Sequence, residues 1–212
     1  MKFLLFVVVV IAAVPDAAYS QQNVNVRLQA ILSDNEIQYS ETADAFHTAL
    51  DRAGLPGGAV WLLNCNNDQA PQVMNTTNLS LQQVLNQLTR ADTRYHWQIA
   101  GAVVNLLPVT GEPSLLTTHV DPFETSYLSP SEALTVLLGR PEVRRALKDR
   151  HLELGLTFVK SLSPTKPTRL TVRFEGGTLR EALNKIAQTS GKAQWEYFEN
   201  HCDGKSEVSI RF

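Results

Sequence analysis

Two short stretches of sequence decide the expected fold: Ser80–Leu88 (SLQQVLNQL) and Thr178–Ile186 (TLREALNKI). They align under a shift of 98 residues (178 − 80), with identical residues at their second, sixth and seventh positions. Both have apolar residues at the spacing i, i+3, i+4 and i+7, which places these residues on one face of a helix. Both also begin with a hydroxyl residue that is followed three positions later by Gln or Glu, the pattern of a capping box. We therefore predict a structural unit that occurs twice.

The similarity between the two halves continues outside these helices. Trp97 and Trp195 obey the same shift, and a shift of 88 residues (127 − 39) matches Tyr39 with Tyr127 further upstream. The difference between the two shifts predicts an insertion in the second half, at about residues 140–149. Alternating apolar residues and turn residues predict strands around the helices, with both tryptophans closing a sheet onto a helix. We therefore expect an α+β fold of two small tandem domains, each with the order β-α-β-β-α-β-β and a mixed sheet packed on two helices.

These matches divide the chain into five parts. We expect a signal peptide, an N-terminal arm, a first copy, a linker and a second copy, with bounds at residues 1–20, 21–34, 35–108, 109–122 and 123–212. The first part has Lys2 ahead of the apolar run Phe3–Val14 and small residues before Gln21, which is typical of a cleaved secretory signal. A run of twelve apolar residues is too short to span a bilayer as a helix. We therefore expect an exported protein, periplasmic or secreted, whose mature chain does not insert into the membrane.

Three features recur in each copy. They are an aromatic strand leading into an Ala- and Leu-rich helix (Tyr39–Leu50 and Phe123–Leu138), a glycine ahead of a strand pair, and the capped helix that runs into a Trp-centred hairpin. In these features the chain resembles the short N-terminal domain shared by secretins and TonB-dependent receptors. The resemblance implies a periplasmic domain that binds signalling partners or neighbouring subunits, without catalytic residues. The chain departs from that family in having two copies where one is usual, with no pore or barrel segment after them.

Charge and histidine spacing exclude several classes of function. The chain has 19 basic and 21 acidic residues, so no basic surface is expected for nucleic acid or for an anionic membrane. The five histidines lack the spacing of metal ligands, and no metal or cofactor is expected. We therefore favour a non-catalytic module that binds proteins of the bacterial envelope. The alternatives are a small-molecule-binding or peptidoglycan-binding protein and a hydrolase with a site between the two copies.

Two sets of residues are candidates for a role in assembly or binding. Cys65 and Cys202 are the two cysteines of the chain, and export would place them in an oxidising compartment. A disulfide that joins the two copies is one expectation, and two free thiols are the other. The last strand, with Val208, Ile210 and Phe212, is expected to be an edge to which a partner protein adds a strand.

Overall fold

The computed structural model of the chain describes residues 23–62, 71–155, 168–201 and 206–212. Helices and strands in these ranges form mixed sheets covered by helices, and the expected α+β class is confirmed. The expected signal peptide, residues 1–20, lies outside the described residues.

The elements follow one another in two similar series. The first series is β1 (Glu36–Tyr39), α2 (Thr42–Ala53), β2 (Gly57–Leu62), β3 (Gln72–Asn75), α3 (Leu81–Ala91), β4 (Tyr95–Ala100) and β5 (Val103–Pro108). After β6 (His119–Val120), the second series is β7 (Phe123–Leu128), α4 (Pro130–Leu138), α5 (Pro141–Asp149), β8 (Glu153–Leu154), β9 (Leu170–Phe174), β10 (Gly177–Thr178), α6 (Leu179–Ser190), β11 (Gln194–Asn200) and β12 (Glu207–Arg211). Residues 140–149, where the sequence predicts an insertion, contain the short helix α5.

The helices α3 and α6 begin where the sequence predicts. The hydroxyls of Ser80 and Thr178 each accept a hydrogen bond from the backbone N–H three residues later. The Gln or Glu at that third position accepts a bond from the backbone N–H of the cap residue in return. Both predicted capping boxes are therefore confirmed, and Ser129 forms a third at the start of α4.

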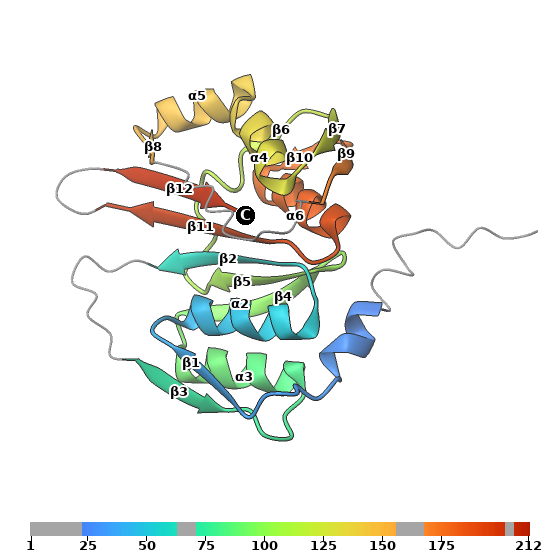
Figure 1. The fold of residues 1–212 in the computed structure, drawn as a ribbon. Helices are drawn as coiled ribbons and strands as arrows, with labels where there is room; N and C mark the ends of the chain where they lie inside the picture. Colours follow the sequence, from blue (N-terminus) through green and yellow to red (C-terminus); the bar gives the residue numbers. More distant parts are fainter. Residues whose placement is uncertain (1–22, 63–70, 156–167, 202–205) are drawn as a thin grey trace, which may run out of the picture.

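One six-stranded sheet runs through the molecule (Figure 1), with the strand order β4-β5-β2-β11-β12-β8. In the first series β4 pairs antiparallel with β5, and β5 pairs parallel with β2. In the second series β11 pairs antiparallel with β12, and β12 pairs parallel with β8. The sequence predicts a separate sheet for each copy, but the two groups of strands join because β2 pairs in parallel with β11.

The described residues also form three two-stranded antiparallel ribbons. They are β1 with β3, β7 with β9, and β6 with β10. The ribbons β1–β3 and β7–β9 each contain the first strand of their series. β3 is the strand directly before α3, whereas the short strand β10 lies between β9 and α6.

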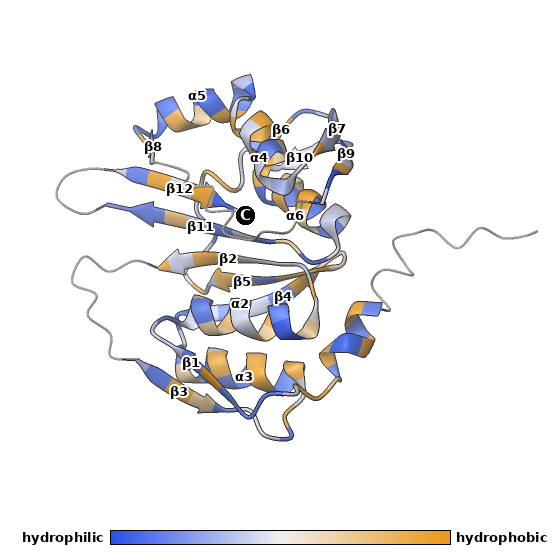
Figure 2. Ribbon diagram, viewed as in Figure 1, coloured by the Kyte–Doolittle hydropathy of each residue, from blue (hydrophilic) through white to orange (hydrophobic). Residues whose placement is uncertain are grey.

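Helices cover both faces of the six-stranded sheet. In Figure 1, α2 and α3 lie on one side of the strands, and α4, α5 and α6 lie on the other. Accordingly, Ala59 and Val60, which are adjacent in β2, belong to different hydrophobic clusters, and so do Val103 and Val104 of β5. The centre of the sheet is therefore buried on both faces. This burial explains why β5 is an almost continuous apolar run, as Figure 2 shows.

Candidate functional site

The two series meet where β2 pairs with β11. Trp195 is fully buried opposite Gly58, and a Cβ atom on Gly58 would lie 1.9 Å from Cε2 of the indole. On the other face, a Cβ atom on Gly57 would lie 2.2 Å from Cδ1 of Leu50 in α2. Two successive glycines therefore let side chains from both faces approach the backbone of β2 closely.

Each series contains a tryptophan that is bonded to an asparagine of the preceding helix. Trp195 Nε1 donates to Asn184 Oδ1 at 2.8 Å, and Trp97 Nε1 donates to Asn86 Oδ1 at 2.9 Å. The expectation that both tryptophans close a sheet onto a helix is confirmed by these bonds. The two side chains differ in exposure, because Trp195 is fully buried and Trp97 is half-buried.

The C-terminal strand is not the open edge that the sequence predicts. β12 lies between β11 and β8, and Gly155 N–H donates to the carbonyl of Val208 at 2.8 Å. The side chains of Val208 and Ile210 are fully buried in the core of the second series, and Phe212 packs against the same core. The edge assignment is therefore wrong. It failed because β8, the strand that covers β12, has only two residues and leaves little signal in the sequence.

One end of the sheet is β4, an edge that the sequence analysis missed. β4 pairs with β5 over all six of its residues without a bulge. Its sequence (YHWQIA) contains no Asp, Glu, Lys, Arg or Pro. Trp97 and Ile99 are half-buried, whereas His96 and Gln98 are exposed. The match of Trp97 with Trp195 does not reveal this edge, because Trp195 lies in the inner strand β11.

Cys65 and Cys202 lie outside the described residues. The described residues closest to them in the β2–β11 ladder, Leu62 and Glu199, are direct partners on two parallel strands. Each cysteine follows its ladder residue by three positions. The pairing of the two cysteines stays a prediction.

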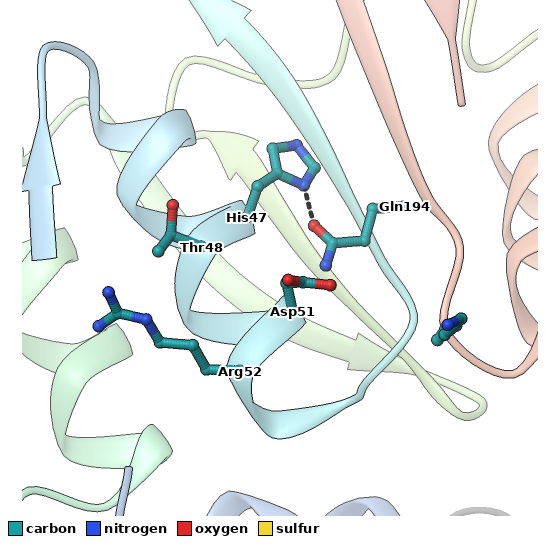
Figure 3. Close-up of a pocket in the computed structure, with 6 residues that line it drawn as sticks. His47, Thr48, Asp51, Arg52 and Gln194 are labelled. Atoms are coloured by element: carbon teal, nitrogen blue, oxygen red, sulfur yellow. Dashed lines mark hydrogen bonds between the residues drawn. The ribbon is translucent and has the colours of Figure 1, made fainter. Parts of the chain in front are cut away.

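A pocket of about 430 Å³ opens beside α2, where the first series meets the start of β11 (Figure 3). Polar side chains line it: His47, Thr48, Asp51, Arg52, Lys192 and Gln194. Figure 3 shows the imidazole of His47 turned toward the amide of Gln194, with Thr48 and Arg52 directed away from that pair.

The imidazole of His47 is held between α2 and β11. Its Nδ1 donates to Gln194 Oε1, and its Nε2 is buried 3.7 Å from Glu196 Oε1. Burial lowers the pKa of His47 below its ordinary value, and the nearby carboxylate of Glu196 offsets this shift only in part. Both ring nitrogens therefore face protein groups, and neither is free to serve a ligand in the pocket.

The imidazole of the pocket is not free to act as a base, although the carboxylate of Asp51 also lines the pocket. A general base must reach the proton that it abstracts, which His47 cannot do in this arrangement. Arg52 is also engaged, because its Nε lies 2.9 Å from Asp34 Oδ2 and its Nη1 donates to the carbonyl of Glu36 at 2.8 Å. His47 and Arg52 are therefore both held by contacts within the protein, and Thr48, Asp51, Lys192 and Gln194 complete the polar lining.

Within the described residues, no three His, Cys, Asp or Glu side chains gather as they would around a metal ion. No helix in the described part of the chain is long and apolar enough to cross a membrane. Comparison of the chain with protein-family models, curated proteins and solved structures finds no match.

Proposed function

We propose that this chain is an exported, non-catalytic module of the bacterial envelope that binds other proteins and is built from two copies of one unit. The sequence of residues 1–20 supports export, and the resemblance to the short N-terminal domain of secretins and TonB-dependent receptors supports the periplasm. The observation that carries protein binding is the β2–β11 junction, where the edge that bears Trp195 accepts a parallel strand. The corresponding edge of the first series is β4, and no described strand pairs with its outer side.

Matching strand pairings support the two copies. Each series has an antiparallel ribbon, an antiparallel hairpin, and a strand parallel to the second strand of that hairpin. Leu85 and Leu183 are also fully buried at matched places in α3 and α6. Replacement of either leucine by Ala should therefore lower the free energy of unfolding by about 2–5 kcal/mol. A change at one site with no effect at the other would contradict equivalent copies.

Affinity capture tests the protein-binding function. The mature chain, immobilised through its N-terminus, is incubated with envelope extract, and the retained proteins are identified by mass spectrometry. We expect at least one retained protein that an excess of free mature chain displaces, because background proteins do not compete for a specific site. Capture of no displaceable protein would contradict the proposal.

Cell fractionation tests export. A bacterium that expresses the chain with its N-terminus intact should deliver a shortened protein to the periplasm or medium. N-terminal sequencing should show that this protein begins at Gln21. An uncleaved chain retained in the cytoplasm would contradict export.

A protein that binds a small polar molecule or a peptidoglycan fragment is the second candidate, because the pocket beside His47 offers about 430 Å³ and a polar lining. Established ligand sites are mostly apolar, so this pocket supports the second candidate less strongly than the sheet edge supports protein binding. Binding of a muropeptide in calorimetry, lost on replacement of Lys192 by Ala, would favour it. A hydrolase would need an acid–base pair facing the pocket, and His47 does not provide one.

A further inference from the structure

We propose that β4 is the docking edge for an extended segment of a partner protein, which adds to the sheet in parallel and places a glycine opposite Trp97. This inference rests on the proposed protein-binding function and specifies its surface. The model for this contact is the pairing of β11 with β2, in which Trp195 lies opposite Gly58. We expect Trp97 of β4 to face a glycine of the added strand in the same way.

The backbone of β4 presents hydrogen-bonding groups to an added strand. The carbonyl of Arg94 accepts from Val109 N–H at 2.8 Å, so the backbone groups of Arg94 point to the β5 side. Successive residues of a strand direct their backbone groups to opposite sides. Trp97 and Ile99 therefore direct theirs to the outer edge. The carbonyl of Tyr95 points the same way, while its N–H donates to the carbonyl of Asp92 at 3.2 Å.

The second series already uses the corresponding backbone groups for strand addition. Ala193 matches Tyr95 under the shift of 98 residues, and its carbonyl accepts from the N–H of Gly57 at 3.3 Å. From that bond onward, β2 runs parallel to β11 for six residue pairs. The outward groups of β4 thus form the same pattern of donors and acceptors that receives β2.

β4 also lacks the features that commonly protect an edge. Natural edge strands are often short, bulged, charged or interrupted by proline. β4 is six residues long, pairs without a bulge and has none of those residue types. β8, at the other end of the sheet, has only two residues. The end of the sheet that can accept a strand is therefore β4.

Trp97 determines which residue the added strand needs. The bond from Trp97 to Asn86 matches the bond that holds the indole of Trp195 on Asn184. The indole of Trp195 fills the space that a Cβ atom on Gly58 would need. An added residue opposite Trp97 meets an indole held in the same way, so glycine fits there as it does in β2.

A second copy of this chain fits the edge less well than a segment of another protein. Within one molecule, β2 adds to β11. The strand that corresponds to β2 in the second series is β8, because β2 pairs in parallel with β5 and β8 pairs in parallel with β12. The same contact between two molecules would therefore add β8 of one molecule to β4 of the other. β8 spans two residues, whereas β2 pairs with β11 over six. The occupant is therefore an extended segment of a different protein.

A peptide copied from β2 serves as the probe. The synthetic peptide Leu55–Leu62 (LPGGAVWL), with lysines added for solubility, is titrated into the isotope-labelled mature chain, and the amide signals are followed by NMR. We expect saturable shifts at Tyr95, Trp97 and Ile99. The matched peptide with Gly58→Val should bind about tenfold or more weakly, because its side chain meets the indole. Equal affinity of the two peptides, or shifts confined to other strands, would overturn the proposal.

A matched pair of protein variants tests the edge directly. Ile99→Pro removes an outward N–H that Ile99→Ala keeps, while both remove most of the same side chain. With both variants folded by circular dichroism, we expect Ile99→Pro to lose the peptide and Ile99→Ala to retain it. If Ile99→Pro does not fold, the two peptides tested on the unmodified chain still decide the question.

The capture and peptide experiments together distinguish a failure of β4 as the docking edge from a failure of the proposed protein-binding function. An envelope protein captured equally well by Ile99→Pro and Ile99→Ala would reject β4 as the surface and leave protein binding intact. Binding of the peptide without any captured envelope protein would reject the function and leave the edge. A concentration-dependent dimer that Ile99→Pro abolishes would show that the occupant is a second copy, and would overturn the assignment to another protein.

Discussion

Replacement of Gly58 by Ala should destabilise the fold, although such a replacement in an extended strand usually does not. The backbone of Gly58 is outside the left-handed region, so Ala would otherwise stabilise the chain by about 0.4–1 kcal/mol through the unfolded state. The added Cβ atom, however, would lie 1.9 Å from Cε2 and 2.3 Å from Nε1 of the Trp195 indole. The ring must therefore move, although it is fully buried.

The size of the loss follows from two terms. Overpacking of a buried site costs about 1–3 kcal/mol. Displacement of the indole from Asn184 leaves a buried N–H without its acceptor, which costs about 1–3 kcal/mol more. After the gain from the unfolded state is subtracted, we expect Gly58→Ala to lower the free energy of unfolding by about 1–6 kcal/mol.

Urea unfolding followed by circular dichroism measures this loss, with Gly139→Ala as the control. Gly139 has φ −76°, and its added Cβ atom would meet its nearest neighbours at an ordinary 3.4 Å, so its change should be within about 1 kcal/mol of zero. The penalty of Gly58→Ala should shrink in a Trp195→Phe background, because the smaller ring leaves room for the methyl group. An unchanged stability of Gly58→Ala, or the same penalty in both backgrounds, would refute the reasoning.

Three further predictions concern other contacts. Asn184→Ala should cost about 1–3 kcal/mol because it leaves a buried indole N–H without an acceptor, whereas Asn86→Ala, at a half-exposed indole, should cost less in the same urea assay. Acidification through about pH 6.5 should lower the free energy of unfolding, because His47 takes up a proton in the unfolded chain while its lowered pKa in the folded chain resists protonation. His47→Gln should lessen this loss, and a pH dependence of stability that is the same in this variant would contradict the prediction. Alkylation of unfolded, unreduced protein should find no free thiol, and breaking a Cys65–Cys202 bond across 137 residues (202 − 65) should cost about 5 kcal/mol; two free thiols would contradict the pairing.

The parts of the fold that could be predicted depend on residues close together in the sequence. The capping boxes at Ser80 and Thr178 were predicted from a spacing of three residues, and the structure contains both. The tryptophans were predicted to close sheets onto helices because Trp97 and Trp195 each follow a capped helix at the same spacing. Such features are readable because their partners lie within a few turns of the same chain.

The candidate binding edge could not be predicted in this way. The sequence indicates that β4 and β12 are both hairpin strands, and nothing local distinguishes an edge strand from an inner one. β12 is an inner strand because β8 pairs with Glu207 and Val208, about fifty residues away in sequence. β4 is an end of the sheet because the strands of the second series join at β2, through β11, and no described strand pairs with the outer side of β4.

The sequence alone determined where α3 and α6 begin and the α+β class, because capping and amphipathic spacing act over a few residues. Only the tertiary structure decided that the two groups of strands form one sheet, that Gly58 makes room for Trp195, and that β4 is an end of that sheet. The pairing of β2 with β11 joins residues 137 positions apart (194 − 57). Such a pairing is selected by how well two surfaces fit in space, and a glycine in the sequence does not reveal which side chain will cover it.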